Sequence, residues 1–174
     1  MVIRLIIILL LFSACKNNEN VDVKVIDIEN NDNINIIKKH NVEFVIPKKF
    51  WYQVNNKNDM QIANYYLLDS NDPSNILSMP NFQINFISKE FGNIDKNIER
   101  WRKQLDSDLN NTKYNKTTDR DINEVVIYNN ESKLIILYFN HNEYTFFLKL
   151  TGYKDSVEQY YQQLKEIAQN AKKL

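Results

Sequence analysis

The chain has 174 residues, and its 22 Lys and Arg balance its 22 Asp and Glu, so the formal net charge is zero. This balance lacks the basic excess of nucleic-acid-binding proteins, and two glycines are too few for a phosphate-binding loop such as Gly-x-x-x-x-Gly-Lys. A single cysteine excludes an intramolecular disulfide, whereas ten tyrosines and nine phenylalanines can fill the core of one domain.

The first fourteen residues have the pattern of a secretory signal. A positively charged start at Met1–Arg4 precedes the apolar run Leu5–Phe12 and the small pair Ser13-Ala14. The run is far shorter than the roughly 20 residues that span a bilayer, so we expect no transmembrane helix here. Phe12-Ser13-Ala14-Cys15 resembles the bacterial lipobox, which implies cleavage before Cys15 and a lipid on its sulfur. The alternative is an ordinary signal peptide that happens to contain a cysteine.

The segment after Cys15 is polar and rich in asparagine as far as about Asn35, and such a segment has too little apolar surface to fold alone. We therefore predict a tether over residues 15–38 and a folded domain over residues 39–174. A single acyl chain anchors a protein to a membrane only marginally, but the resemblance to the lipobox implies several acyl chains on this cysteine. Lys16 replaces the Asp that retains enteric lipoproteins on the inner membrane. The expected location is the outer membrane where one exists, and otherwise the outer face of the cell membrane.

The first half of the domain shows three strand patterns. Val42–Ile46 is a short apolar run that Pro47 ends, because proline cannot donate a hydrogen bond to a ladder. Gln61–Leu68 is a second strand, and the turn residues of Asn71–Ser74 follow it. Over Asn81–Ser88 apolar and polar residues alternate, which predicts a half-buried strand with two different faces. Its apolar face holds Phe82, Ile84 and Phe86, and its polar face holds Gln83 and Asn85.

A helix follows, since apolar residues recur at spacings of three and four. Asn93 is a suitable N-cap. The predicted buried stripe consists of Ile94, Ile98, Trp101, Leu105 and Leu109.

Three strands and a second helix complete the chain. The strands are predicted at Glu124–Tyr128, Lys133–Asn140 and Glu143–Leu150, with asparagine-rich hairpin turns between them. Thr151-Gly152 is expected to end the last strand. Asp155–Glu158 resembles a capping box at the start of a helix that runs to about Ala171. The expected fold class is therefore α+β, with helices packed on an antiparallel sheet.

Four segments in this order resemble the PsbP-like family, which includes the extrinsic photosystem II protein PsbP and the Ran-binding Mog protein of yeast. They are Phe44-Val45-Ile46-Pro47 followed by Trp51, Met60–Tyr65, Asn97–Gln104 with its Asn-x-x-Arg-Trp-x-x-Gln pattern, and Phe146–Gly152 with Lys-x-Thr-Gly. The resemblance spans about Val42 to Leu174. It implies an α/β/α sandwich with a sheet of about six strands, and members that act mainly by binding other proteins. Fold alone does not determine function.

The sequence shows no catalytic or metal-binding pattern. His40 lies near the tether and His141 in a predicted turn, and no Gly-x-Ser-x-Gly motif is present. Zinc is not expected without further cysteines, and the acidic residues Asp106, Asp108, Asp119 and Asp121 lack the spacing and the turn glycine of a calcium loop. We expect neither a cofactor nor enzymatic activity.

Four residues are candidates for binding a partner. Arg100 and Gln104 lie four apart on the predicted helix, and Lys149 can point to the same layer, so the three could form a polar groove. The alternative is a hydrogen-bond network that fixes the helix to the sheet. Trp51 belongs to an aromatic group that could form a binding patch or pack in the core. Residues 100 and 102 point about 160° apart around a helix, which argues against a nucleic-acid grip around Trp101.

The sequence favours a lipid-anchored, non-enzymatic protein of the cell envelope that binds another protein. An envelope hydrolase or small-ligand carrier is the alternative, and a deep pocket with convergent polar groups would favour it.

Overall fold

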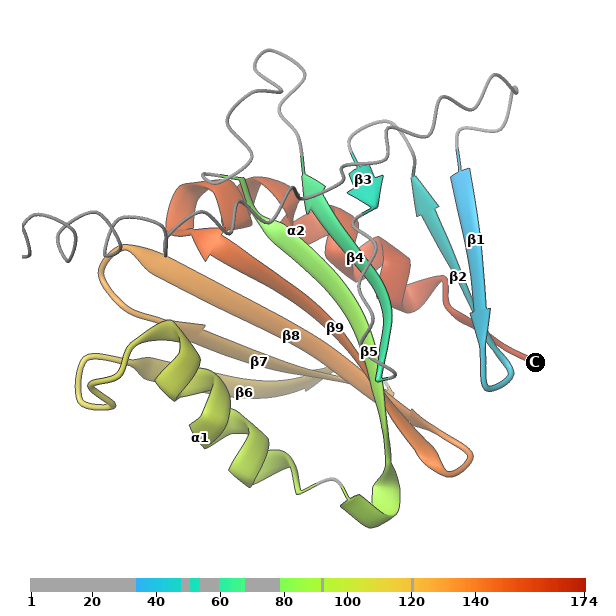
Figure 1. Cartoon of the computed structure of the whole chain (residues 1–174), viewed down its shortest axis with the longest axis horizontal. Coiled ribbons are helices and arrows are strands. Elements are labelled where there is room, and N and C mark those ends of the chain that lie inside the picture. Colours follow the sequence, from blue (N-terminus) through green and yellow to red (C-terminus); the bar gives the residue numbers. More distant parts are fainter. Residues whose placement is uncertain (1–33, 48–50, 54–59, 68–78, 92, 120) are drawn as a thin grey trace, which may run out of the picture.

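The computed structural model describes residues 34–47, 51–53, 60–67, 79–91, 93–119 and 121–174, which form two antiparallel sheets and two α helices (Figure 1). The strands are β1 Ile34–Lys39, β2 Val42–Pro47, β3 Trp51–Gln53, β4 Gln61–Leu67, β5 Asn81–Ser88, β6 Lys113–Asp119, β7 Ile122–Tyr128, β8 Ser132–His141, β9 Tyr144–Tyr153 and β10 Lys172–Lys173. The helices are α1 Ile94–Leu105 and α2 Lys154–Gln169, and a short 3-10 helix, Lys89–Phe91, precedes α1. The predicted α+β class is confirmed. In the described part, neither helix is long and apolar enough to cross a bilayer.

The larger sheet contains seven of the described strands, in the order β3-β4-β5-β9-β8-β7-β6. The smaller sheet has the order β1-β2-β10. Every pairing in both sheets is antiparallel. The helices lie on opposite sides of the larger sheet, as Figure 1 shows, so the predicted sandwich of sheet and helices is present.

One face of the larger sheet is covered by α2 and by β2. The alternation predicted for β5 is confirmed here, because Phe82 and Ile84 are fully buried on this face. Successive side chains of a strand point to opposite faces, so one apolar residue in every two is sufficient to form an apolar surface on one face. The main buried residues of this layer are Val42, Phe44, Ile46, Phe82, Ile84, Leu137, Phe139, Phe146, Leu148, Leu150, Val157 and Leu164.

The opposite face is covered by α1 over β7 and β8. Trp101 is only 3% exposed and packs edge-on against Phe147, with 5.6 Å between the ring centroids. The expectation that Trp101 belongs to the core is confirmed. The buried residues of this layer are Ile98, Trp101, Val125, Ile127, Leu134, Ile136, Tyr138 and Phe147.

The start of α1 is as predicted, but its end is not. The Asn93 side chain accepts hydrogen bonds from the backbone N–H groups of Asp95 and Lys96, as an N-cap does. The helix ends at Leu105, and Leu109 lies in the loop beyond it. Asp106 and Asp108 each accept a hydrogen bond from a backbone N–H two residues ahead, which favours turns over a helix.

The junction between β9 and α2 also differs from the prediction. The strand continues through Thr151-Gly152 to Tyr153, and α2 starts directly at Lys154. No side chain caps its first turn, so the capping box predicted at Asp155–Glu158 does not form. Backbone pairing of Gly152 with Lys133 in β8 continues the ladder past the expected break.

The described fold begins earlier than predicted. Residues 34–38 were expected in the tether but belong to β1, which pairs along its whole length with β2. Ile37 packs on the apolar core, while Ile34 and Ile36 are exposed on the outer side. A sequence of single isoleucines between asparagines is typical of a linker. Its strand conformation here depends on pairing with β2, which the local sequence does not indicate. Residues 1–33, including the predicted signal and Cys15, lie outside the described residues.

His40 occupies the turn between β1 and β2 and is enclosed by aromatic rings. Its ring stacks on Tyr144 at 3.8 Å between centroids and meets Phe86 edge-on at 4.5 Å. The buried Nε2 atom has no hydrogen-bond partner. Burial and the nearby charge of Lys39 lower the pKa of His40 from its ordinary value of 6.5, so the folded state favours the neutral imidazole.

Because the folded-state pKa of His40 lies below its unfolded-state value, acid should destabilise the fold. The contribution of neutral His40 to the free energy of unfolding is fully present above about pH 6.5. It is lost as the pH falls below this value, because the unfolded chain binds the proton more readily than the folded one. Urea unfolding at about pH 7.5 and about pH 5 checks this. His40→Asn, which tolerates the positive φ of 49° at this position, should reduce the acid-dependent loss. The matched control is His141→Asn; an equal effect of both variants would refute the assignment to His40.

Candidate functional site

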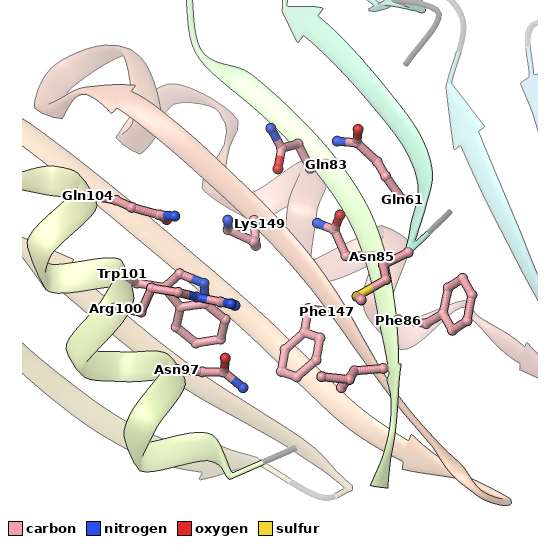
Figure 2. Close-up of a pocket in the computed structure, with 12 residues that line it drawn as sticks. Gln61, Gln83, Asn85, Phe86, Asn97, Arg100, Trp101, Gln104, Phe147 and Lys149 are labelled. Atoms are coloured by element: carbon pink, nitrogen blue, oxygen red, sulfur yellow. The ribbon is translucent and has the colours of Figure 1, made fainter. Parts of the chain in front are cut away.

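A pocket of about 360 Å³ lies between α1 and the strands β4, β5 and β9 (Figure 2). Figure 2 shows side chains from the helix and from the strands that point toward one another across it. Its lining residues are Met60, Gln61, Gln83, Asn85, Phe86, Ile87, Asn97, Arg100, Trp101, Gln104, Phe147 and Lys149. None of these twelve carries a carboxylate, although the chain has as many acids as bases.

The polar wall of the pocket follows from the alternation within β5. Phe82 and Ile84 point into the core under α2, so Gln83 and Asn85 must point to the other face. The ladder places Gln83 between Asn64 of β4 and Lys149 of β9. Cross-strand neighbours in such a ladder lie about 5 Å apart at their Cβ atoms, so one polar residue on each strand produces a continuous polar strip.

The helix supplies the facing wall through one edge. Asn97, Arg100 and Gln104 follow spacings of three and four and therefore lie along one side of α1. This edge adjoins the buried stripe, because Trp101 lies between Arg100 and the sheet and forms part of the pocket floor. The structure thus brings Arg100, Gln104 and Lys149 together in one pocket, the arrangement considered from the sequence.

No hydrogen-bond network connects these three residues. Within the described part of the chain, the side chains of Arg100, Gln104 and Lys149 form no hydrogen bond and no ion pair. The hydrogen bonds nearby belong to the sheet wall, where Gln83 donates to Asn81 and Asn81 donates to Asn64, each at 2.7 Å. The helix is therefore attached to the sheet by the packing of Trp101 rather than by polar contacts among the candidate residues.

Lys149 carries the strongest electrostatic perturbation in the pocket. Its Nζ lies 5.7 Å from the centroid of the Trp101 ring, and it faces Arg100 across the pocket (Figure 2). Burial, and secondarily the charge of Arg100, lower the pKa of Lys149 from 10.5 to about 8. The cation–π contact offsets only part of the desolvation. A half-buried lysine without a counter-ion costs stability, and such perturbed groups gather at functional sites.

Arg102 has a different role from that of Arg100. Its guanidinium donates to the carbonyl and to the hydroxyl of Thr112, at 2.9 and 3.1 Å, and also to the carbonyl of Leu109. These bonds fix the loop after α1. The two arginines on either side of Trp101 therefore serve separate surfaces, as the helical geometry predicted.

The remaining candidate residues are placed only in part. Trp51 lies in the edge strand β3, where its backbone pairs with Leu67, and its side chain lies outside the described residues. Cys15 also lies outside them. His40 and His141 have different surroundings: the partly buried ring of His40 packs against aromatic rings, and His141 contacts the neighbouring Asn142. Within the described residues, no group of three His, Cys, Asp or Glu is arranged to hold a metal ion.

The sequence identified Lys149 of β9 but left the contribution of β4 and β5 to the pocket unidentified. Gln83 and Asn85 were assigned to the polar face of their strand, but the sequence does not give the strand order that places them beside Lys149. Gln61 reaches the pocket through an irregularity in β4, where the register shifts between Gln61 and Ala63. The sequence signal that could have indicated this wall of the pocket is the amide side chains on both strands, Gln61 in β4 and Gln83 and Asn85 in β5.

Comparison with solved structures identifies the fold. The chain is similar to the cyanobacterial PsbP protein CyanoP from Synechocystis sp. PCC 6803, with a TM-score of 0.53 and 11% sequence identity over 82% of this chain and 93% of that chain. PA94, a protein of unknown function from Pseudomonas aeruginosa, gives a TM-score of 0.42 and 14% identity over 80% of this chain and 96% of its own. The sequence itself matches no family model and no curated protein. The predicted resemblance to PsbP is confirmed for the fold.

Replacing Lys149 by methionine should stabilise the protein, because the uncompensated charge disappears and the chain length is kept. The lowered pKa corresponds to a gain of about 3 kcal/mol near pH 7, where the charged lysine is disfavoured by the fold. The gain should shrink as the pH rises from about 8 toward 10.5, since the folded wild type then loses its proton before the unfolded chain does. Thermal unfolding of both proteins across this range measures the difference. A lower melting temperature for Lys149→Met would instead indicate a structural role.

Proposed function

We propose that this protein is a lipid-anchored, non-enzymatic component of the cell envelope that binds another protein at the pocket between α1 and β9. The observation that carries the proposal is Lys149, which is half-buried, has no counter-ion among the described residues and faces a second cation, Arg100. A group that costs folding stability and has no structural bond is best explained by a ligand that compensates it. Binding, rather than catalysis, agrees with a site built from amides and two cations.

A lipid anchor at Cys15 would hold the folded domain at a membrane surface. The charged start, the short apolar run and the small residues before Cys15 support export and lipidation. The polar segment up to β1 supports a tether long enough to separate the domain from the bilayer. Residues 16–33 amount to a reach of roughly 60 Å when extended, so the pocket could meet a partner well above the membrane surface.

The second candidate function is a small-ligand carrier, and the size of the pocket favours it. A volume of about 360 Å³ lies within the range of roughly 300–1,000 Å³ that is usual for small-molecule sites. Its polar side chains also converge, which is the feature that distinguishes a carrier from a flat docking surface. Native mass spectrometry of protein purified from its own cells would reveal a retained small molecule.

Lipidation is tested by metabolic labelling with a palmitate analogue. The wild-type protein should incorporate the label and partition with membranes, whereas Cys15→Ala should lose both properties because its sulfur is the only one available for acylation. Since removing the cysteine can also impair export, the readout includes the size of the chain on a gel. Equal labelling of the two proteins would refute the anchor.

The partner is tested by site-specific photocrosslinking in cells. A photoreactive phenylalanine analogue at Gln104, which is exposed and lines the pocket, should capture a protein partner. The control position is Gln159 on the outer side of α2, away from the pocket. Capture of a distinct protein only from position 104 supports the proposal. Absence of any product from 104, with a retained small molecule in the mass spectrum, would favour the carrier.

A further inference from the structure

Two cations share the pocket, and none of the described residues that line it is acidic. Arg100 reaches it from α1 and Lys149 from β9, and the lining contains no Asp or Glu. Elsewhere in the described part of the chain, four lysines pair with acidic side chains, and unpaired cations such as Lys96 and Lys103 are exposed to solvent, whereas Lys149 is half-buried. The pocket is thus a place where the fold holds positive charge without supplying its complement.

An anion in this pocket would restore the balance. A negative group between the two cations favours the charged form of Lys149, because opposite charges in contact offset desolvation. Hydrogen bonds from a guanidinium or an ammonium to an anionic oxygen are about twice as strong as neutral ones. Binding of the anion then offsets the free energy of folding that the half-buried charge of Lys149 costs.

The amides indicate which kind of anion fits. Gln83, Asn85 and Gln104 line the pocket near the cations, and each carboxamide can both donate and accept. This combination complements the N–H and C=O groups of a peptide backbone. The rings of Trp101 and Phe147 form an apolar floor that suits the methylene groups of a glutamate side chain.

A phosphate group fits the same pocket less well. Proteins commonly hold phosphate at helix N-termini, where free backbone N–H groups point at the anion. Here α1 presents its side, since Arg100 lies in the middle of Ile94–Leu105 and Asn93 already occupies the N-terminal N–H groups. By charge alone, one arginine and one lysine balance a dianion as well as a carboxylate, so the preference rests on the side-on position of α1 and on the amides, and phosphate is kept as a competing probe.

We infer that the pocket binds the carboxylate of an acidic peptide segment of the partner, with Arg100 and Lys149 as its two cationic contacts. This inference rests on the proposed function, because it specifies what the partner presents to the pocket. Gln83, Asn85 and Gln104 hold the adjoining peptide groups, and Trp101 carries the apolar part of the side chain.

The test is calorimetric titration of the full chain, kept in detergent, with three probes. The first is a blocked peptide, acetyl-Ser-Glu-Glu-Ser-Gly-amide. The second replaces both of its glutamates by glutamine. The third is inorganic phosphate. The acidic peptide should bind at least about tenfold more tightly than the amide peptide, as expected for one charge-assisted contact. It should also bind more tightly than phosphate.

Two variants connect the binding to the pocket. Arg100→Gln and Lys149→Met should each weaken the acidic peptide by about tenfold or more, and neither residue has a structural hydrogen bond to lose. The matched control is Lys103→Gln, which removes an exposed charge from the same helix outside the pocket and should change affinity by less than about twofold. Equal melting temperatures of the control and the wild type verify the fold.

Three outcomes would overturn the inference. They are equal binding of the acidic and amide peptides, undiminished binding to Lys149→Met, and tighter binding of phosphate, which would make the pocket an oxyanion site. If photocrosslinking at Gln104 still captures a protein, the proposed function stands while the carboxylate assignment fails. If the acidic peptide binds as expected but no protein is captured in cells, the proposed function fails instead.

Discussion

The hairpin of β8 and β9 is covered on both of its faces, and the rest of the structure depends on that packing. Leu134–Phe139 is buried without interruption because alternate residues face α2 and α1. One helix is about 10 Å wide and adjacent strands are about 4.8 Å apart, so α1 can cover only two or three strands of seven. The helix lies over β7 and β8 (Figure 1), and the β4 and β5 side of that face is left to the pocket, whose lining there includes the amides Gln61, Gln83 and Asn85.

The sequence predicted the elements whose side chains follow a clear period. The buried face of β5, the stripe of α1 from Ile94 to Leu105 and the turn at Asn129–Ser132 were all found where periodicity and turn chemistry placed them. The prediction of strands failed where the pairing of backbones, rather than a side-chain pattern, determines whether a segment is a strand. β1 and β6 lack a strong apolar pattern, and β9 passes through Gly152 because β8 supplies its partner. Such pairing depends on residues distant in sequence, which a local pattern does not contain.

The candidate site shows the same division. Arg100 and Gln104 could be related to each other by helical spacing, and Lys149 could be assigned to the same layer from strand alternation. The amides of β4 and β5 could not be added, since that needs the order in which strands pair. The structure also adds information about energy. Arg100, Gln104 and Lys149 form no hydrogen bonds with one another, and Lys149 lies where burial disfavours its charge. A hydrogen-bond network among these three residues, the alternative considered from the sequence, is therefore absent from the described part of the chain, and their role in binding is a proposal.

The strand β6 has a consequence for solubility. All seven of its residues are exposed, and it is joined to the sheet by its ladder with β7. Without it, the apolar β7, with Val125 and Ile127, would become the edge of the sheet, and an open apolar edge is a template for pairing with other chains. β6 presents Lys113 and Lys116 at that edge instead, and charged side chains discourage intermolecular strand addition. A strand whose side chains are all exposed thus covers an apolar edge with a charged one, which is a known way in which sheet proteins avoid edge-to-edge pairing.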